Sequence, residues 1–200
     1  MPAMKLLLAA LLAAIVSFVW GYISWMQLGW HDAGMRDFKD EAAVAQVLKD
    51  NATNGRGIYI LPYQRKPQNF ASEEEKAQLK ADHEQALADG PYIYAIVRPG
   101  RQDGSMGENL IRSFIRSLIA SLIVGALMNL LVISYAGRVS FAGALGAFAG
   151  LAVDMQQWIW FELPTRDLIV NMADHFIEWT LAGAVLGLFL GKDPTVRDVH

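Results

Sequence analysis

The chain has 200 residues, of which 54% are hydrophobic and 18% are charged, and its formal net charge is −3. Soluble domains carry about 25% charged residues, and a nucleic-acid-binding domain needs a strongly basic face. The absence of cysteine excludes disulfides, thiolate metal sites and thiol nucleophiles. The composition favours a membrane-embedded protein with an insert and argues against nucleic acid as a partner.

The first apolar segment, residues 6–28, contains no charged side chain. Its length fits the roughly 20 apolar residues that a membrane-spanning helix needs. A cleaved signal peptide has an apolar region of only about 7–15 residues and ends at a small-residue site. This segment instead runs into Trp25, Trp30 and His31. We therefore predict an uncleaved first transmembrane helix within residues 1–29.

Residues 30–111 are polar and predict a small insert that begins with a helix. Asp37 is a candidate N-cap for a helix that continues to about Asp50. Residues 72–75 form a capping box that opens a second helix, and Gly90 closes that helix.

Two short strands are predicted in the same insert, within residues 55–63 and 91–97. The order strand, helix, strand favours a right-handed βαβ unit with two parallel strands. Because two strands alone make a marginal sheet, we expect the insert to pack against the membrane surface or against another protein.

Three further apolar segments follow the insert, and each is long enough to cross a membrane. The chain is therefore predicted to be an α-helical integral membrane protein, a four-helix transmembrane bundle with a small periplasmic α/β insert between helices 1 and 2. These segments cover residues 113–135, 139–161 and 168–190 within the region 112–191, and residues 192–200 are predicted to be a cytoplasmic tail.

Lysine and arginine near the helix ends predict the orientation of the chain. Lys5, Arg138 and two residues of the tail fall on one side, which places both termini in the cytoplasm and the insert in the periplasm. Four arginines oppose this orientation, but they flank a loop longer than about 60 residues, for which the rule weakens. The tail residues are Lys192 and Arg197, and the opposing residues are Arg98, Arg101, Arg112 and Arg116.

Small residues at four-residue spacing let transmembrane helices approach each other closely. The last segment carries Gly183, Gly187 and Gly191, and the preceding segment carries Gly146 and Gly150. This spacing favours a tight intramolecular bundle. The alternative is that one of these faces, above all on the last helix, packs against another subunit.

The last apolar segment also carries ionisable side chains, each of which costs about 2.5–3.5 kcal/mol at the centre of a bilayer helix on insertion scales. Asn171, Asp174, His175 and Glu178 share one stripe at 100° per residue. Hairpin topology brings this stripe to the same side of the membrane as charged residues of the two preceding helices. The predicted polar cluster consists of Arg112, Arg116, Asp154, Asn171, Asp174, His175 and Glu178.

Three interpretations of this cluster remain open. In the first, the two arginines neutralise Asp154 and Asp174, His175 hydrogen-bonds locally, and the role is structural. In the second, the acids mark a proton or cation path, although they stop at mid-bilayer. In the third, His175 and Glu178 join Asp154 or His31 as metal ligands. No serine, histidine and acid pattern predicts a nucleophile, and no cofactor is expected.

Five stretches of sequence carry a further signal: FVWGYISWMQLGWH, FKDEAAVAQVLK, GIYILP, GPYIYA and WIWFELPTRDLIVNMADHFIEWTLAGAVLG. They resemble a family of small bacterial inner-membrane proteins with four transmembrane helices, and the tryptophan-rich pieces are the most specific. Gly29 stands where the family carries proline, which loosens the turn after the first helix. The resemblance implies a bacterial origin and an inner-membrane location, and it brings no established activity.

The sequence thus predicts a non-enzymatic accessory or assembly subunit of the membrane, whose insert engages a membrane-protein partner or a second copy of the chain. The alternative is a small transporter or ion-handling protein that uses Asp154, Asp174, His175 and Glu178. A metal-dependent membrane enzyme is the third interpretation.

Overall fold

The computed structural model describes residues 3–100 and 105–191. These residues form two compact units. The helical unit contains the residues up to Arg36 and those from Ser105 onward, and the insert contains the residues from Asp37 to Gly100. The predictions about Arg101 and about the tail with Lys192 and Arg197 lie outside the described residues.

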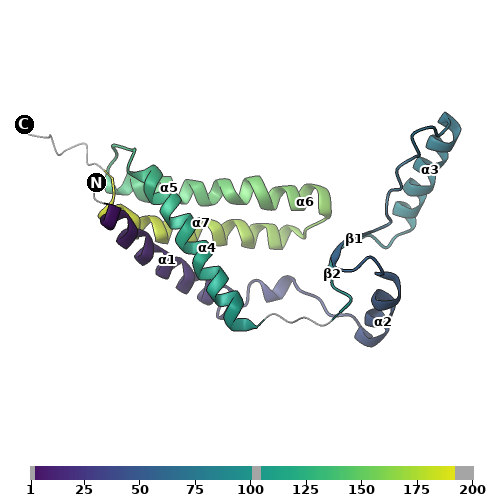
Figure 1. Cartoon of the computed structure of the whole chain (residues 1–200), viewed down its shortest axis with the longest axis horizontal. Coiled ribbons are helices and arrows are strands. Elements are labelled where there is room, and N and C mark those ends of the chain that lie inside the picture. Colours follow the sequence, from purple (N-terminus) through teal and green to yellow (C-terminus); the bar gives the residue numbers. More distant parts are fainter. Residues whose placement is uncertain (1–2, 101–104, 192–200) are drawn as a thin grey trace, which may run out of the picture. The chain divides into compact units, whose positions relative to one another are not determined.

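The helical unit is built from long helices (Figure 1). Among the described residues, three helices are long and apolar enough to span a membrane, and they cover Ala3–Met26, Met106–Met128 and Tyr135–Phe161. A fourth helix has 25 residues, but Asp174, His175 and Glu178 interrupt its apolar sequence. The elements are α1 (Ala3–Met26), η1 (Asp32–Gly34), α4 (Met106–Met128), α5 (Tyr135–Ala149), η2 (Gly150–Asp154), α6 (Met155–Phe161) and α7 (Thr165–Phe189).

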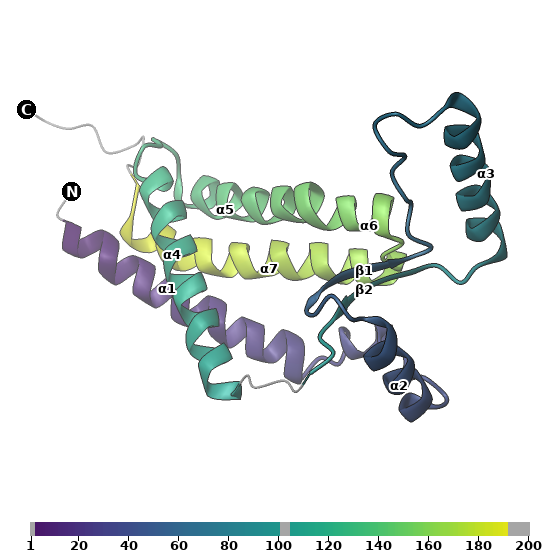
Figure 2. The same ribbon diagram turned by 45° about the vertical axis from the view of Figure 1, so that its right-hand side comes forward.

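Helix α7 is the centre of this unit. It packs against α5 on one side and against α1 on the other, and α4 packs mainly on α1. Figure 2 shows α5 and α7 side by side and α1 crossing α4. Because α4 and α5 share no extensive contact and α4 meets α7 only weakly, the four helices are arranged as an open row, α4–α1–α7–α5. Small residues of α1 and apolar residues of α4 and α7 form its core.

Two features of the helices differ from the prediction. Helix α4 begins at Met106 instead of residue 113, because the Ser105 hydroxyl accepts a hydrogen bond from the Glu108 amide at 3.1 Å and caps polar turns that hydropathy alone does not mark. The helix that starts with α5 contains a π-helical turn, η2, which ends at Asp154. Such turns insert a residue into the helix and are common at functional sites.

The insert contains two strands, β1 (Gly57–Leu61) and β2 (Ile93–Val97), and they pair antiparallel, with Ile58 opposite Ile96 and Leu61 opposite Ile93. The prediction of a parallel βαβ unit was therefore wrong. A crossover helix has to cover the sheet with an apolar stripe, and the intervening helix α3 (Glu73–Asp89) has no buried residue. Without that stripe, α3 does not hold a crossover in place.

The caps of the two insert helices follow from local side-chain chemistry. Helix α2 (Glu41–Asn51) is capped by Asp40, whose carboxylate accepts a hydrogen bond from the Ala43 amide at 2.9 Å; the predicted cap, Asp37, was wrong. The capping box of α3 is confirmed, and Gly90 ends that helix with a φ of +61°. Hydrogen bonds from its own backbone amide and from Ser72 hold the pKa of Glu74 below its usual value.

Candidate functional site

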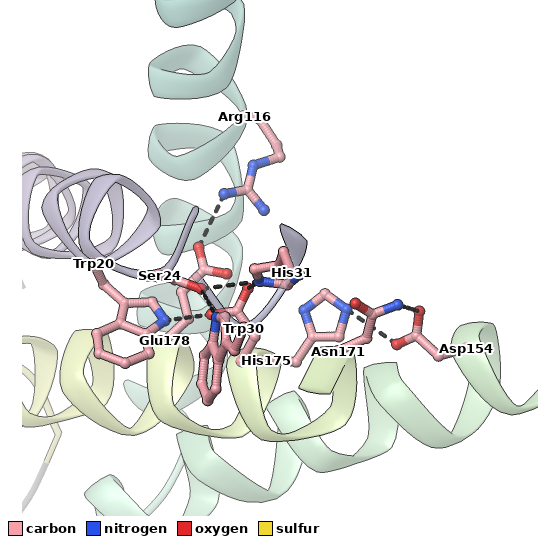
Figure 3. A network of polar contacts seen from close by, with 10 residues as sticks. Trp20, Ser24, Trp30, His31, Arg116, Asp154, Asn171, His175 and Glu178 are labelled. Atoms are coloured by element: carbon pink, nitrogen blue, oxygen red, sulfur yellow. Dashed lines mark hydrogen bonds and ion pairs between the residues drawn. The ribbon is translucent and has the colours of Figure 1, made fainter. Parts of the chain in front are cut away.

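The three carboxylates buried within the helical unit come from α7 and η2, and each meets partners from other helices (Figure 3). Asp154, Asp174 and Glu178 are each less than one-tenth exposed. A buried carboxylate is tolerated when it is paired and hydrogen-bonded.

Glu178 joins α7 to both α1 and α4. The Ser17 hydroxyl of α1 donates a hydrogen bond to Glu178 Oε1. Arg116 Nη2 of α4 lies 3.0 Å from the same oxygen and 3.2 Å from the Ser117 hydroxyl. The Glu178 side chain is 7% exposed, whereas that of Arg116 is 58% exposed. The ion pair therefore joins a buried anion to a cation that keeps much of its surface accessible.

Asp174 ties the turn after α1 back onto α7. Trp20 Nε1 donates to Asp174 Oδ1 at 2.6 Å, and His31 Nε2 lies 3.5 Å from Asp174 Oδ2. The same His31 nitrogen is 3.1 Å from the Ser24 hydroxyl, which also accepts a hydrogen bond from Trp30 Nε1 at 3.0 Å. The Trp20, Ser24 and His31 side chains thus hold one end of α1 against α7.

Aromatic rings enclose His31. The Trp25 ring stacks on the imidazole with centroids 3.8 Å apart, and the Trp30 ring meets it edge-on at 5.8 Å. Ser24 and Asp174 both face Nε2 of His31. In a nucleophilic triad the hydroxyl and the acid face opposite ring nitrogens. The geometry around His31 therefore resembles a packed structural histidine more than a catalytic one.

Asp154 joins the π-helical turn to α7. His175 Nε2 lies 3.2 Å from Asp154 Oδ2, and Asn171 Nδ2 donates to Oδ1 at 3.4 Å. The turn η2 ends at Asp154, where a regular α-helix would direct the side chain differently. This turn has no obvious signal in the sequence, and it supplies the partner of His175.

The predicted pairing within the cluster is corrected by these contacts. Arg116 pairs with Glu178, and Arg112 pairs with Glu108 of its own helix. Histidines, one from the turn after α1 and one from α7 itself, take the place of arginines beside the two aspartates. His175 therefore reaches another helical segment instead of bonding locally. The later residues of α4 lie farther along the helix than predicted, because α4 starts at Met106.

Three partners were missed by sequence reasoning, and all are neutral side chains of α1. Ser17, Trp20 and Ser24 recur at spacings of three and four residues within an otherwise apolar helix. That spacing puts them on one face. A polar stripe on a spanning helix is a usable signal for a buried partner, although it does not name the partner.

The candidate metal ligands are divided among separate groups. Among the described residues, no group of three histidine or acidic side chains is placed to hold a metal ion. Asp154 lies with His175, His31 lies beside Asp174, and Glu178 lies with Arg116.

The small-residue faces of α5 and α7 pack against each other. A Cβ added to Gly183 would lie 2.3 Å from the Cβ of Ala142, and one added to Gly146 would lie 2.3 Å from the backbone oxygen of His175. These glycines therefore serve contacts within the chain. Gly150, Gly187 and Gly191 are likewise close to side chains of the neighbouring segment.

A second candidate site lies in the insert, on the two-stranded antiparallel sheet of β1 and β2. This pair of strands is called the hairpin, although α3 lies in the connection between them. Neither strand contains a charged residue. One face exposes Ile58 and Ile96, which are 59% and 75% exposed, and the other exposes Leu61 and Ile93, which are 48% and 41% exposed. Strands without polar alternation are typical of sheets that are covered on both faces.

The insert does not cover this hairpin with its own helices. Neither α2 nor α3 packs extensively against the strands. Within the described part of the insert, Ala52 and Val97 are the only buried apolar residues. A hollow of about 360 Å³ runs along β1 and is lined by Asn54, Gly57, Ile58, Tyr59, Ile60 and Tyr63.

No protein-family model, curated protein or solved structure matches the chain.

Proposed function

We propose that the chain is a multi-pass protein of the bacterial inner membrane that acts as a non-enzymatic accessory or assembly subunit. It engages a protein partner through the β1–β2 hairpin of its insert. The observation that carries this proposal is the hairpin itself, which is apolar on both faces and is left exposed by the other described elements of the insert.

The chemistry of the hairpin favours protein over lipid as its cover. Burial of one large aliphatic side chain is worth about 1.5–3 kcal/mol, so Ile58, Leu61, Ile93 and Ile96 together provide a substantial drive for association. A bilayer surface can cover one face of a two-stranded sheet, and it offers little to the backbone groups at the strand edges. A protein can cover both faces and pair with an edge.

The helical unit supports the proposal as an anchor. Each of its three buried carboxylates accepts a hydrogen bond from a side chain of another helical segment, Arg116 for Glu178, Trp20 for Asp174 and Asn171 for Asp154, which favours a structural role over an ion path. With these charges paired, α7 can serve as the fourth transmembrane helix. Four spans put both termini on the same side of the membrane and the insert on the other, and Lys5 and Arg138 favour the cytoplasm for the termini and the periplasm for the insert.

The proposal is tested by affinity capture of the tagged full-length chain from native membranes at natural abundance, followed by mass spectrometry. We expect a stoichiometric partner that is lost from the double variant Ile58→Asp, Ile96→Asp. The matched control is Val47→Asp, which places the same charge on an exposed apolar position of α2.

Retention of the partner by the control and its loss from the hairpin variant would support the proposal. A chain that is captured alone, or a partner that is retained by the double variant, would contradict it. Circular dichroism of both purified variants should show the same helical content as the parent, which separates loss of the surface from loss of the fold.

A further inference from the structure

We infer that the free edge of β1 accepts a third strand from the partner, and that this strand is an extended apolar segment with acidic residues at both ends. This inference rests on the proposed function, because it specifies how the hairpin is covered. It follows from the edge, the hollow and the charges of the described insert.

The edge of β1 is unpaired and unprotected. The sheet has two strands, so each strand has one edge whose outward backbone N–H and C=O groups are free to pair. Proteins guard such edges with charged residues, prolines or bulges. The strand Gly57–Leu61 contains none of these, and Pro62 follows only after its end.

The hollow favours β1 over β2 as the receiving strand. Its lining residues come from β1 and its flanks, and none comes from β2. No residue of β1 is buried, whereas Val97 of β2 is. Tyr59 is already positioned by a hydrogen bond from its hydroxyl to the backbone oxygen of Gly55 at 2.7 Å.

The charges at both ends of β1 define the partner. Arg56 directly precedes the strand, and Arg65 and Lys66 lie four and five residues after its last residue, Leu61. All three are exposed, and none forms an ion pair within the described residues. An incoming strand with acidic ends would place a carboxylate beside each basic group. Exposed pairs of this kind add modestly to affinity and strongly to orientation and choice of partner.

The same charges disfavour a second copy of the chain. An antiparallel pair of β1 strands centred on Tyr59 would place Arg56 of each copy opposite Pro62 of the other, on the side where Arg65 and Lys66 of that copy follow. A parallel pair would place identical basic residues side by side. Like charges that face each other across neighbouring strands are destabilising, so the edge fits a different protein better than itself.

The test uses the full-length chain in phosphatidylcholine nanodiscs and fluorescein-labelled synthetic peptides. The probe is DEVTVTVED, and its two controls are KKVTVTVKK and a copy of the probe with N-methylated backbone amides at alternate positions. Fluorescence anisotropy measures affinity, and hydrogen exchange locates the bound strand. We expect each control to bind at least tenfold more weakly than the probe. We also expect new amide protection within residues 57–61.

A charge-reversed chain, Arg56→Glu, Arg65→Glu, Lys66→Glu, should prefer the basic peptide by a similar factor. Equal affinity for acidic and basic peptides, absence of peptide binding, or protection confined to residues 93–97 would overturn the inference. So would the same protection of the outward-facing amides of residues 57–61, which do not pair with β2, in the absence of peptide, either through self-association or in nanodiscs that contain phosphatidylglycerol.

The two proposals can fail separately. If the capture experiment succeeds and the peptides do not bind, the partner covers the faces of the hairpin, and only the edge inference falls. If the peptides bind as expected and the chain is captured alone, the edge accepts a strand while the accessory-subunit proposal falls.

Discussion

Glu178 is the acid on which most of the helical unit converges. Its side chain is buried on α7, accepts a hydrogen bond from the Ser17 hydroxyl of α1, and forms an ion pair with Arg116 of α4. Removing one partner of a buried pair leaves an uncompensated charge, which costs far more than the pair contributes when intact. Because Arg116 is more than half exposed, solvent screens part of that cost.

Substitution Arg116→Ala is therefore expected to lower the free energy of unfolding by about 1–3 kcal/mol. The measurement is equilibrium unfolding in mixed detergent micelles, followed by tryptophan fluorescence. The matched control is Arg112→Ala on the same helix, because Arg112 pairs with Glu108 at an exposed position and should contribute about 0.5 kcal/mol or less. Equal losses in the two variants would contradict a special role for Arg116.

At this scale the sequence indicated that Asp154, Asp174 and Glu178 need partners, but it did not predict which side chains those partners are. An ionisable residue in an apolar helix is visible from composition, and the need for a partner follows from the cost of burial. Which partner it meets depends on helix starts and local turns. The early start of α4 and the π-helical turn before α6 therefore altered which partners the acids meet. Neither feature has a strong sequence signal.

At the scale of elements, the α5–α7 contact depends on glycine. The backbone oxygen of His175 would lie 2.3 Å from a Cβ at position 146, and backbone atoms cannot move aside as a flexible side chain can. The two helices would have to separate. Small residues that permit close approach are a main source of helix association in lipid.

Gly146→Ala is accordingly expected to destabilise the helical unit by about 1–3 kcal/mol, the usual range for overpacking. Thermal denaturation in detergent, monitored by loss of the monodisperse peak on size-exclusion chromatography, measures the effect. Gly21→Ala is the control, since a Cβ there meets nothing within 4 Å and alanine favours the helix by about 1 kcal/mol. A loss at position 21 as large as at position 146 would argue against close packing as the cause.

Helix α3 is the element whose stability should respond to pH. The pKa of Glu74 is held below its usual value by hydrogen bonds from its own amide and from Ser72. A lowered folded-state pKa means that ionised Glu74 stabilises the helix above the unfolded-state pKa, and that this stabilisation is lost as the pH falls through the lowered value. The first turn of α3 should therefore fray on acidification.

Hydrogen exchange of the amides at the start of α3 tests this expectation across the acidic range. Glu74→Gln should remove the part of the pH response that comes from this carboxylate, and Glu84→Gln, farther along the same helix, should leave it in place. An unchanged pH profile in Glu74→Gln would show that another group controls the fraying.

Local sequence signals predicted the helices and strands of the insert, but they did not predict that β1 and β2 pair antiparallel. The capping box at Ser72 and Glu75 and the closing Gly90 follow from adjacent residues, so the bounds of α3 could be read directly. Strand direction depends on whether the connecting helix covers the sheet. Helix α3 has only scattered apolar residues, a fact that argues against a parallel crossover and that the order of elements alone does not reveal.

For the whole molecule, the central position of α7 reconciles its polar residues with a membrane location. One side of α7 meets α1, and the other side meets α5 and η2. Its acids therefore face protein, as ionisable residues within membranes generally do. Hydropathy alone ranks α7 below the other long helices, because it counts each side chain as if it faced lipid.

Single cysteines can test the resulting topology, because the chain contains no native cysteine. The proposed orientation places Gln78 of the insert and Pro164 before α7 in the periplasm, and Leu130 between α4 and α5 in the cytoplasm. A membrane-impermeant maleimide should label Gln78→Cys and Pro164→Cys in cells with a permeabilised outer membrane. It should label Leu130→Cys only after lysis. Labelling of Leu130→Cys before lysis would reverse the orientation.

A fluorescent protein fused to the C-terminus tests whether α7 crosses the bilayer. It should fluoresce, because it folds in the cytoplasm if α7 spans. A dark fusion with otherwise expected labelling would mean that α7 does not span, and its paired acids would then lie in a re-entrant or surface helix.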